Sequence, residues 1–108
     1  MRFGWFASAE LGAILAEDDI PLHCDAVQAP CAMTVSGLAN HANLISLSGR
    51  KIFGPQGIGA LFVRHTLLVR MSPLIHGGGQ QNGLRSGTVP VPLCVGMATA
   101  TRLLRGEN

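Results

Sequence analysis

Lys51 is the only lysine in the 108 residues, and the other seven Lys or Arg residues are all arginine. Arginine does not form an imine at neutral pH, so Lys51 is the single side-chain candidate for Schiff-base chemistry. Glycines surround it, at positions 49, 54, 57 and 59. Such glycines allow close approach of backbone to a ligand and leave N–H groups for an anion. The alternative interpretation is a solvated surface lysine in a loop.

An acid and an amide precede Lys51. Asp25 and Gln28 stand 26 and 23 residues before it. If the chain turns between them, the two side chains can hold a ring nitrogen and a neighbouring ring oxygen of one planar ligand. The pair alone is also typical of surface residues that end a strand, so its value depends on its combination with Lys51.

Three short apolar runs predict the strands that position these side chains. The first covers residues 21–28 and leads into a loop, and the others cover 44–48 and 58–63. We expect the last two to be buried on both faces. Lys51 then follows the end of a strand, which is where open α/β sheets bind ligands.

Helices are expected at both ends of the sequence. Residues 8–19 carry Leu11, Ile14 and Leu15 at helical spacing, which predicts an amphipathic helix. A second helix is predicted from Val91 to just before Gly106, with prolines at its start. The glycines of residues 77–79 predict a flexible loop before it. The order helix, strand, strand, strand, loop, helix indicates an α/β fold in layers.

Composition indicates part of a larger globular unit. The chain is 47% hydrophobic and only 13% charged, and its mean hydropathy is +0.33. A self-contained domain of this size usually has a more charged surface, so we expect other polypeptide to cover part of this one.

Several partners and sites are disfavoured. The longest apolar run is far shorter than a membrane span of roughly 18–20 residues, and no secretory signal is evident, so we expect a cytoplasmic location. The net charge of +2 is spread along the chain, which does not favour nucleic acid. Cys24, Cys31 and Cys94 lack C-x-x-C spacing, so no metal site is predicted and buried thiols are the simplest interpretation.

Four motifs occur in order within residues 8–104. They are His23-x-Asp25-Ala26-x-Gln28, Ser48-Gly49-x-Lys51-x-x-Gly54-Pro55-x-Gly57-Ile58-Gly59-Ala60-Leu61, Gly77-Gly78-Gly79-Gln80 and Leu84-Arg85-Ser86-Gly87-Thr88. In this order and spacing, the sequence resembles the middle of a cysteine desulfurase of the NifS and IscS kind, in the class V aminotransferase family.

The resemblance implies a fold and an activity. The fold is part of the large domain of a fold-type I pyridoxal phosphate enzyme, with a mixed, mostly parallel sheet flanked by helices, and residues 1–108 form one partial domain. The activity is removal of sulfur from L-cysteine, giving alanine and a persulfide for iron–sulfur cluster or thio-cofactor assembly. A homodimer and a sulfur-acceptor protein are implied as partners.

The resemblance also implies roles for six residues. Lys51 forms the internal aldimine and moves protons, and Asp25 pairs with the protonated pyridine nitrogen. Gln28 binds the phenolic oxygen. The phosphate is bound by Ser48 and Arg50, with Thr88 reaching the phosphate in the neighbouring subunit.

The sequence departs from the family pattern in three ways. Arg50 replaces a histidine, although arginine is a stronger phosphate ligand. Residues 1–6 replace an Asn-Asn-Glu-x-Gly segment, and none of the three cysteines matches the family's sulfur-accepting loop. Two alternatives therefore stay open: a non-catalytic remnant acting as an interaction module, and a phosphate or nucleotide binder. The second alternative lacks the usual glycine-rich phosphate-binding motifs.

Overall fold

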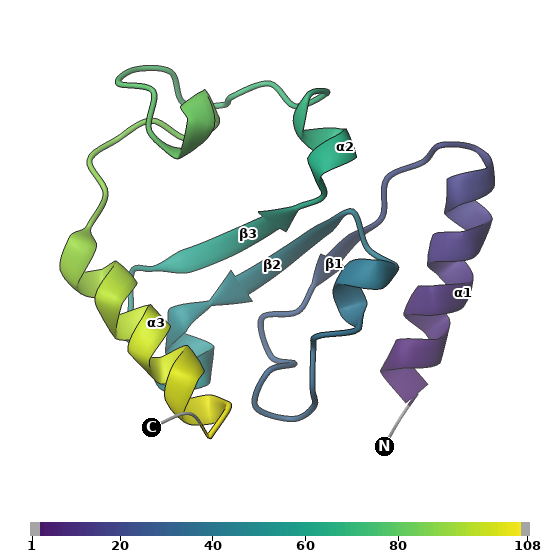
Figure 1. Cartoon of the computed structure of the whole chain (residues 1–108), viewed down its shortest axis with the longest axis horizontal. Coiled ribbons are helices and arrows are strands. Elements are labelled where there is room, and N and C mark those ends of the chain that lie inside the picture. The colour runs from purple at the N-terminus through teal and green to yellow at the C-terminus, as the bar shows by residue number, and fades with distance from the viewer. Residues whose placement is uncertain (1–2, 107–108) are drawn as a thin grey trace.

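A computed structural model describes residues 3–106 as helices around a small sheet (Figure 1). The helices and strands are α1 (Phe3–Glu17), β1 (His23–Asp25), β2 (Leu44–Ser48), β3 (Gly59–Val63), α2 (His65–Leu68) and α3 (Val91–Leu104). Three 3-10 turns connect them: η1 (Leu38–Asn40), η2 (Gly49–Ile52) and η3 (Gln81–Gly83). The predicted α/β class and element order are confirmed, and the short helix α2 is an addition that the sequence pattern did not predict.

The sheet is mixed and has the strand order β1-β2-β3. β1 and β2 are parallel, with Asp25 paired to Ser46. β2 and β3 are antiparallel, with Ser48 paired to Gly59. The parallel pair places the carboxyl ends of β1 and β2 at the same edge of the sheet, and Figure 1 shows the end of β2 beside α3.

The core lies around β1, β2 and η1. Its buried members are Ala26, Leu38, Ala42 and Ile45. Cys24 and Leu47 are partly buried against them. Two of these four side chains are alanine, so the core offers modest hydrophobic stabilisation.

β3 corrects one expectation from the sequence. We expected both later strands to be buried on two faces, but Leu61 and Phe62 on β3 are 50% and 38% exposed. The prediction is wrong for β3 because this strand forms an edge of the sheet and α3 packs mainly against η2. An apolar run alone does not distinguish an edge strand from a covered one.

α1 corrects a second expectation. It begins at Phe3 instead of residue 8, and Leu11 and Ile14 of its predicted apolar face are exposed. The helix instead comes closest to the rest of the chain at Gly12, where an added Cβ would lie 2.7 Å from the carbonyl oxygen of His41. Because glycine has no side chain, the backbone of α1 packs directly against the backbone of His41, just after η1.

α3 agrees with its prediction at both ends. Pro90 precedes its first residue, Pro92 is at its second position, and Gly106 follows its end with a φ of 73°. Its contact with the segment after η2 is close. An added Cβ on Gly96 would lie 2.9 Å from Cγ of Pro55, and one on Gly54 would lie 3.3 Å from Cβ of Ala100.

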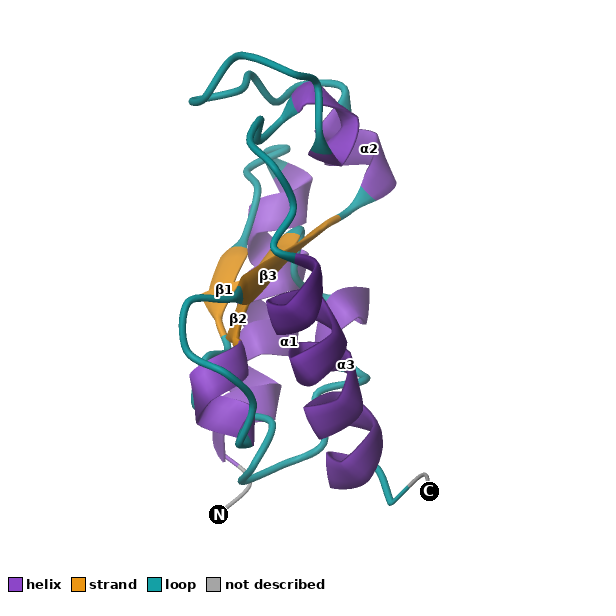
Figure 2. Ribbon diagram, turned by 90° about the vertical axis from the view of Figure 1, so that its left-hand side faces the viewer, coloured by secondary structure: helices purple, strands orange, loops and turns teal. Residues whose placement is uncertain are grey.

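The glycine-rich segment after α2 lies on the β3 side of the sheet. Figures 1 and 2 both show it above the strands, between α2 and the start of α3 along the chain. It is closed by hydrogen bonds from Gly79 N to Ser86 Oγ at 3.3 Å and from Gly87 N to Gln80 Oε1 at 3.0 Å. Among residues 3–106, no helix has the length and apolar character needed to cross a membrane.

Candidate functional site

The candidate site lies at the carboxyl edge of the parallel pair. Asp25 is the last residue of β1 and Ser48 is the last of β2. Gln28 follows on the turn after β1, and Arg50 and Lys51 follow within η2. Five of the six predicted site residues therefore come from two neighbouring strand ends, as the sequence predicted.

Lys51 lies on a tightly packed turn. Gly49 is buried, and an added Cβ there would lie 2.7 Å from Cγ2 of Ile58 and 3.0 Å from the carbonyl oxygen of Pro55. Gly49 also donates its N–H to Ile58 O at 3.0 Å and accepts from Gly54 N at 2.9 Å. Lys51 is half-buried. This packing fixes the backbone that carries the amine, so a glycine is required two residues before the lysine.

Arg50 points into solvent next to Lys51. It is exposed, so its guanidinium is accessible to an anion. Ser48, at the N-cap of η2, is half-buried and adds a hydroxyl at the same turn. A hydroxyl and a guanidinium at one turn form a donor set suited to a phosphate group.

Asp25 is held by the turn that follows it. Its Oδ1 accepts a hydrogen bond from Val27 N at 3.0 Å, and Ala26 N donates to Ser46 O at 3.0 Å. The carboxylate is exposed, whereas Cys24 packs on the core side of the strand. Burial, and secondarily the charge of Asp25, raise the pKa of the Cys24 thiol. The expected alternation of Cys24 and Asp25 across the strand is confirmed.

A polar pair next to Asp25 was missed by sequence reasoning. Nε2 of His23 and Oγ of Ser46 share a hydrogen bond of 2.7 Å across β1 and β2. His23 and Asp25 are two residues apart on β1, and Ser46 is the register partner of Asp25, so the three side chains share one face of the sheet. The separation of 23 residues hid this pairing, since only the strand register shows it.

A second missed contact joins the two segments of the site. Sγ of Cys31, on the exposed loop after β1, donates a hydrogen bond to the carbonyl oxygen of Lys51 at 2.9 Å. The loop that carries Gln28 is therefore attached to the turn that carries Lys51. The expectation of a buried thiol is wrong for Cys31, because the loop after Pro30 leaves it exposed.

Thr88 lies apart from the other predicted residues. It is exposed in the loop before α3. No hydrogen bond within residues 3–106 joins it to Asp25 or Lys51. Its predicted role, contact with the phosphate bound in a neighbouring subunit, stays a prediction.

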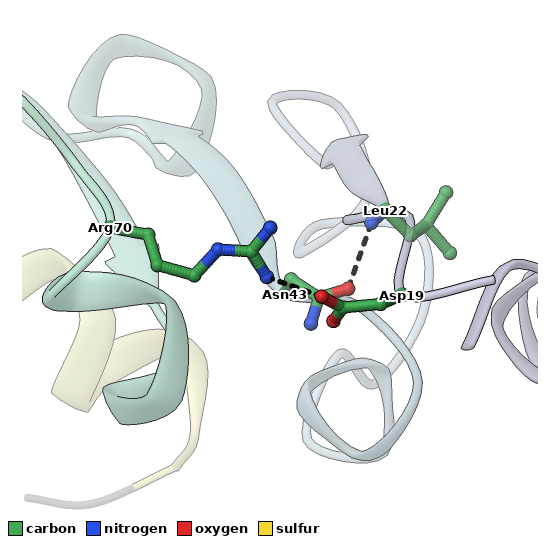
Figure 3. Close-up of polar contacts among 4 residues, drawn as sticks. All are labelled: Asp19, Leu22, Asn43 and Arg70. Carbon is green, nitrogen blue, oxygen red and sulfur yellow. Dashed lines mark hydrogen bonds and ion pairs between the residues drawn. The ribbon is translucent and has the colours of Figure 1, made fainter. Parts of the chain in front are cut away.

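Two cavities flank the sheet. One, of about 160 Å³, lies beside Asp25 and Cys24 and is lined mainly by apolar loop residues. The other, of about 220 Å³, lies beyond the amino ends of β1 and β2. Its lining includes Asp19 and Arg70, an exposed ion pair with a distance of 2.9 Å, and Asn43, all drawn in Figure 3. Within residues 3–106, no three His, Cys, Asp or Glu side chains are placed to share a metal ion.

The donor set at the carboxyl edge fits pyridoxal phosphate. An amine, a carboxylate and an amide match the aldehyde, the ring nitrogen and the phenolic oxygen of the cofactor, and Ser48 with Arg50 matches its phosphate. All five side chains lie at or just after the ends of β1 and β2.

Comparison with known proteins identifies the family of the chain. The aminotransferase class-V family matches residues 4–107. The mitosomal cysteine desulfurase of Trachipleistophora hominis is 45% identical over 98 residues, covering 91% of this chain and 22% of that protein. The chain thus spans about a fifth of the length of this curated relative.

Solved structures agree as well. A NifS-like protein superimposes with a TM-score of 0.82 at 36% identity, covering 92% of this chain and 27% of the other. SspA, solved in complex with cysteine, has a TM-score of 0.76 at 45% identity, covering 88% of this chain and 27% of the other. The predicted resemblance is confirmed, and the chain belongs to the aminotransferase class-V family, as a segment homologous to cysteine desulfurases.

Proposed function

We propose that this chain is the pyridoxal phosphate-binding core of a cysteine desulfurase. The observation that carries the proposal is the placement of Lys51, half-buried on a packed turn, at the same sheet edge as the exposed carboxylate of Asp25. The 45% sequence identity to a cysteine desulfurase over 91% of the chain supports it. Bound pyridoxal phosphate supplies an electron sink for the substrate's α-carbon.

Each residue has a defined task in this proposal. The Lys51 amine binds the cofactor and moves a proton to and from the substrate carbon. Asp25 accepts the N–H of the protonated ring, which keeps the ring electron-withdrawing. Gln28 donates its amide to the phenolic oxygen. Ser48 and Arg50 bind the phosphate, and Thr88 reaches the phosphate bound by a second copy in a homodimer.

The reaction also needs a sulfur acceptor. L-Cysteine and an acceptor thiol yield alanine and a persulfide, so atoms balance when the sulfur moves from the substrate carbon to the acceptor. The solved structure of SspA with cysteine supports L-cysteine as the substrate class. Delivery of the persulfide to an iron–sulfur or thio-cofactor assembly protein, in the cytoplasm, completes the proposal.

Reductive labelling tests the cofactor role. The purified chain is incubated with pyridoxal phosphate, reduced with borohydride and mapped by peptide mass spectrometry. We expect the pyridoxyl group on the Lys51 peptide, because this is the only lysine. Lys51→Arg, which keeps the charge, is the control and should leave that peptide unlabelled. Labelling only at the α-amino group of Met1 contradicts the proposal.

Sulfur release tests the catalytic role. With L-cysteine, pyridoxal phosphate and a reductant, we expect this chain alone to form little alanine or sulfide. Cys24 and Cys94 are half-buried, and the Cys31 thiol donates a hydrogen bond to the carbonyl oxygen of Lys51. A sulfur acceptor, in contrast, must be mobile. Robust turnover that disappears in Cys31→Ser would identify Cys31 as the acceptor. Robust turnover that persists would require a different mechanism.

A further inference from the structure

Cys31 makes a contact that the proposed function does not use. Its Sγ lies 2.9 Å from the carbonyl oxygen of Lys51, although the two residues are 20 positions apart. The last carbonyl groups of a helix have no acceptor role inside it. Lys51 is in the last part of η2, so the thiol supplies a donor to a carbonyl that the turn itself leaves for outside partners.

Both sides of this contact are anchored. The loop of Cys31 is held by hydrogen bonds to Ala29 O from Ala32 N and Met33 N, each at 2.9 Å, and Ala29 packs against the core. On the other side, Gly49 and Gly54 close the turn of Lys51. A hydrogen bond between two segments that are each held in place fixes the distance between the Cys31 loop and the Lys51 turn. A hydrogen bond from a mobile loop would not fix it.

We propose that Cys31 is a positioning residue that sets the placement of Lys51 relative to the loop after β1. This loop begins directly after Asp25 and includes Gln28. The thiol therefore links the ring-binding side of the site to its amine. The Lys51 amine placed in this way is the group that binds the proposed cofactor, so this part of the inference rests on the proposed function.

The size of the effect follows from the donor. A thiol is a weak hydrogen-bond donor, and a typical hydrogen bond contributes about 0.5–1.5 kcal/mol net. We therefore expect Cys31→Ala to weaken pyridoxal phosphate binding by about twofold to tenfold. Cys31→Ser restores a donor at the same position and should return the affinity toward that of the unmodified chain.

The test combines two readouts on the whole chain. The first is the visible absorption band of bound pyridoxal phosphate and its pH dependence, which report the environment of the Lys51 amine. The second is amide hydrogen exchange of the 49–54 segment without cofactor, where Gly54 N donates to Gly49 O. Cys31→Ala should shift the band's pH profile and speed this exchange, and Cys31→Ser should reverse both changes. Thr34→Ala, a substitution at an exposed position on the loop that carries Cys31, is the control and should change neither.

The outcomes separate the inference from the proposed function. If Cys31→Ala leaves both the pH profile and the exchange unchanged, Cys31 does not position Lys51. If Cys31→Ala and Cys31→Ser change both readouts equally, the effect comes from a general loss of packing. The inference is then also wrong. If the unmodified chain binds no pyridoxal phosphate, the proposed function fails, and the exchange readout alone then decides the inference.

Discussion

Asn43 and Leu22 are joined by two hydrogen bonds in opposite directions. The Oδ1 atom of Asn43 accepts from Leu22 N at 2.8 Å (Figure 3), and Asn43 N donates to Leu22 O at 2.8 Å. The pair lies just before β1 and β2, so it aligns the starts of the two parallel strands. The strand ends that carry Asp25 and Ser48 depend on this alignment.

Replacing Asn43 by alanine should destabilise the chain. The change leaves the partly buried Leu22 N–H without its acceptor, which costs about 1–3 kcal/mol of unfolding free energy. Urea unfolding followed by circular dichroism measures this loss. The control is Asn40→Ala, at an exposed position in η1, which should change the free energy by less than about 0.5 kcal/mol. Equal effects of the two substitutions would show that the side-chain bond of Asn43 does not align the strands.

Gly49→Ala should destabilise the turn that carries Lys51. The added methyl would lie 2.7 Å from Ile58 Cγ2 and 3.0 Å from a backbone oxygen, and such overpacking costs about 1–3 kcal/mol. Thermal unfolding and pyridoxal phosphate affinity should both decrease. Gly78→Ala is the control, because its methyl would meet only the side-chain end of Gln80. An unchanged melting temperature in Gly49→Ala would show that the turn has room for the added methyl group.

Arg50→Ala should weaken binding of the cofactor phosphate. Loss of a charge-assisted hydrogen bond at an exposed position should raise the Kd by about tenfold. Titration at two salt concentrations measures the effect, which should shrink at higher salt. Arg50→Lys keeps the charge and should lose less affinity. An unchanged Kd in Arg50→Ala places this side chain outside the phosphate site.

The sequence predicted the strand ends better than it predicted burial. Asp25, Ser48 and Lys51 were placed correctly because each follows an apolar run whose end is set by local residue types. Burial of α1 and β3 was predicted incorrectly because it depends on which elements cover them. The contact between Cys31 and Lys51 was not predictable, since it requires the relative placement of two loops.

The Cys24 thiol should react slowly. Burial and the nearby Asp25 raise its pKa above the ordinary value of 9.0, so less thiolate is present at any pH below that. Alkylation at pH 8 with peptide mapping should modify the exposed Cys31 before Cys24. Because the folded state favours the protonated thiol, its contribution to stability is present below pH 9 and decreases as the pH rises above it. Faster modification of Cys24 than of Cys31 would contradict the assigned burial.

The exposed edge formed by β3 has a consequence for handling the isolated chain. Residues 59–63 contain no charged residue and no proline, and both of these features protect edge strands from pairing with other molecules. Leu61 and Phe62 are also solvent-accessible. Strand addition between molecules is second order in protein, so the time for which this chain stays monomeric in solution is set by its concentration as well as by its folding free energy.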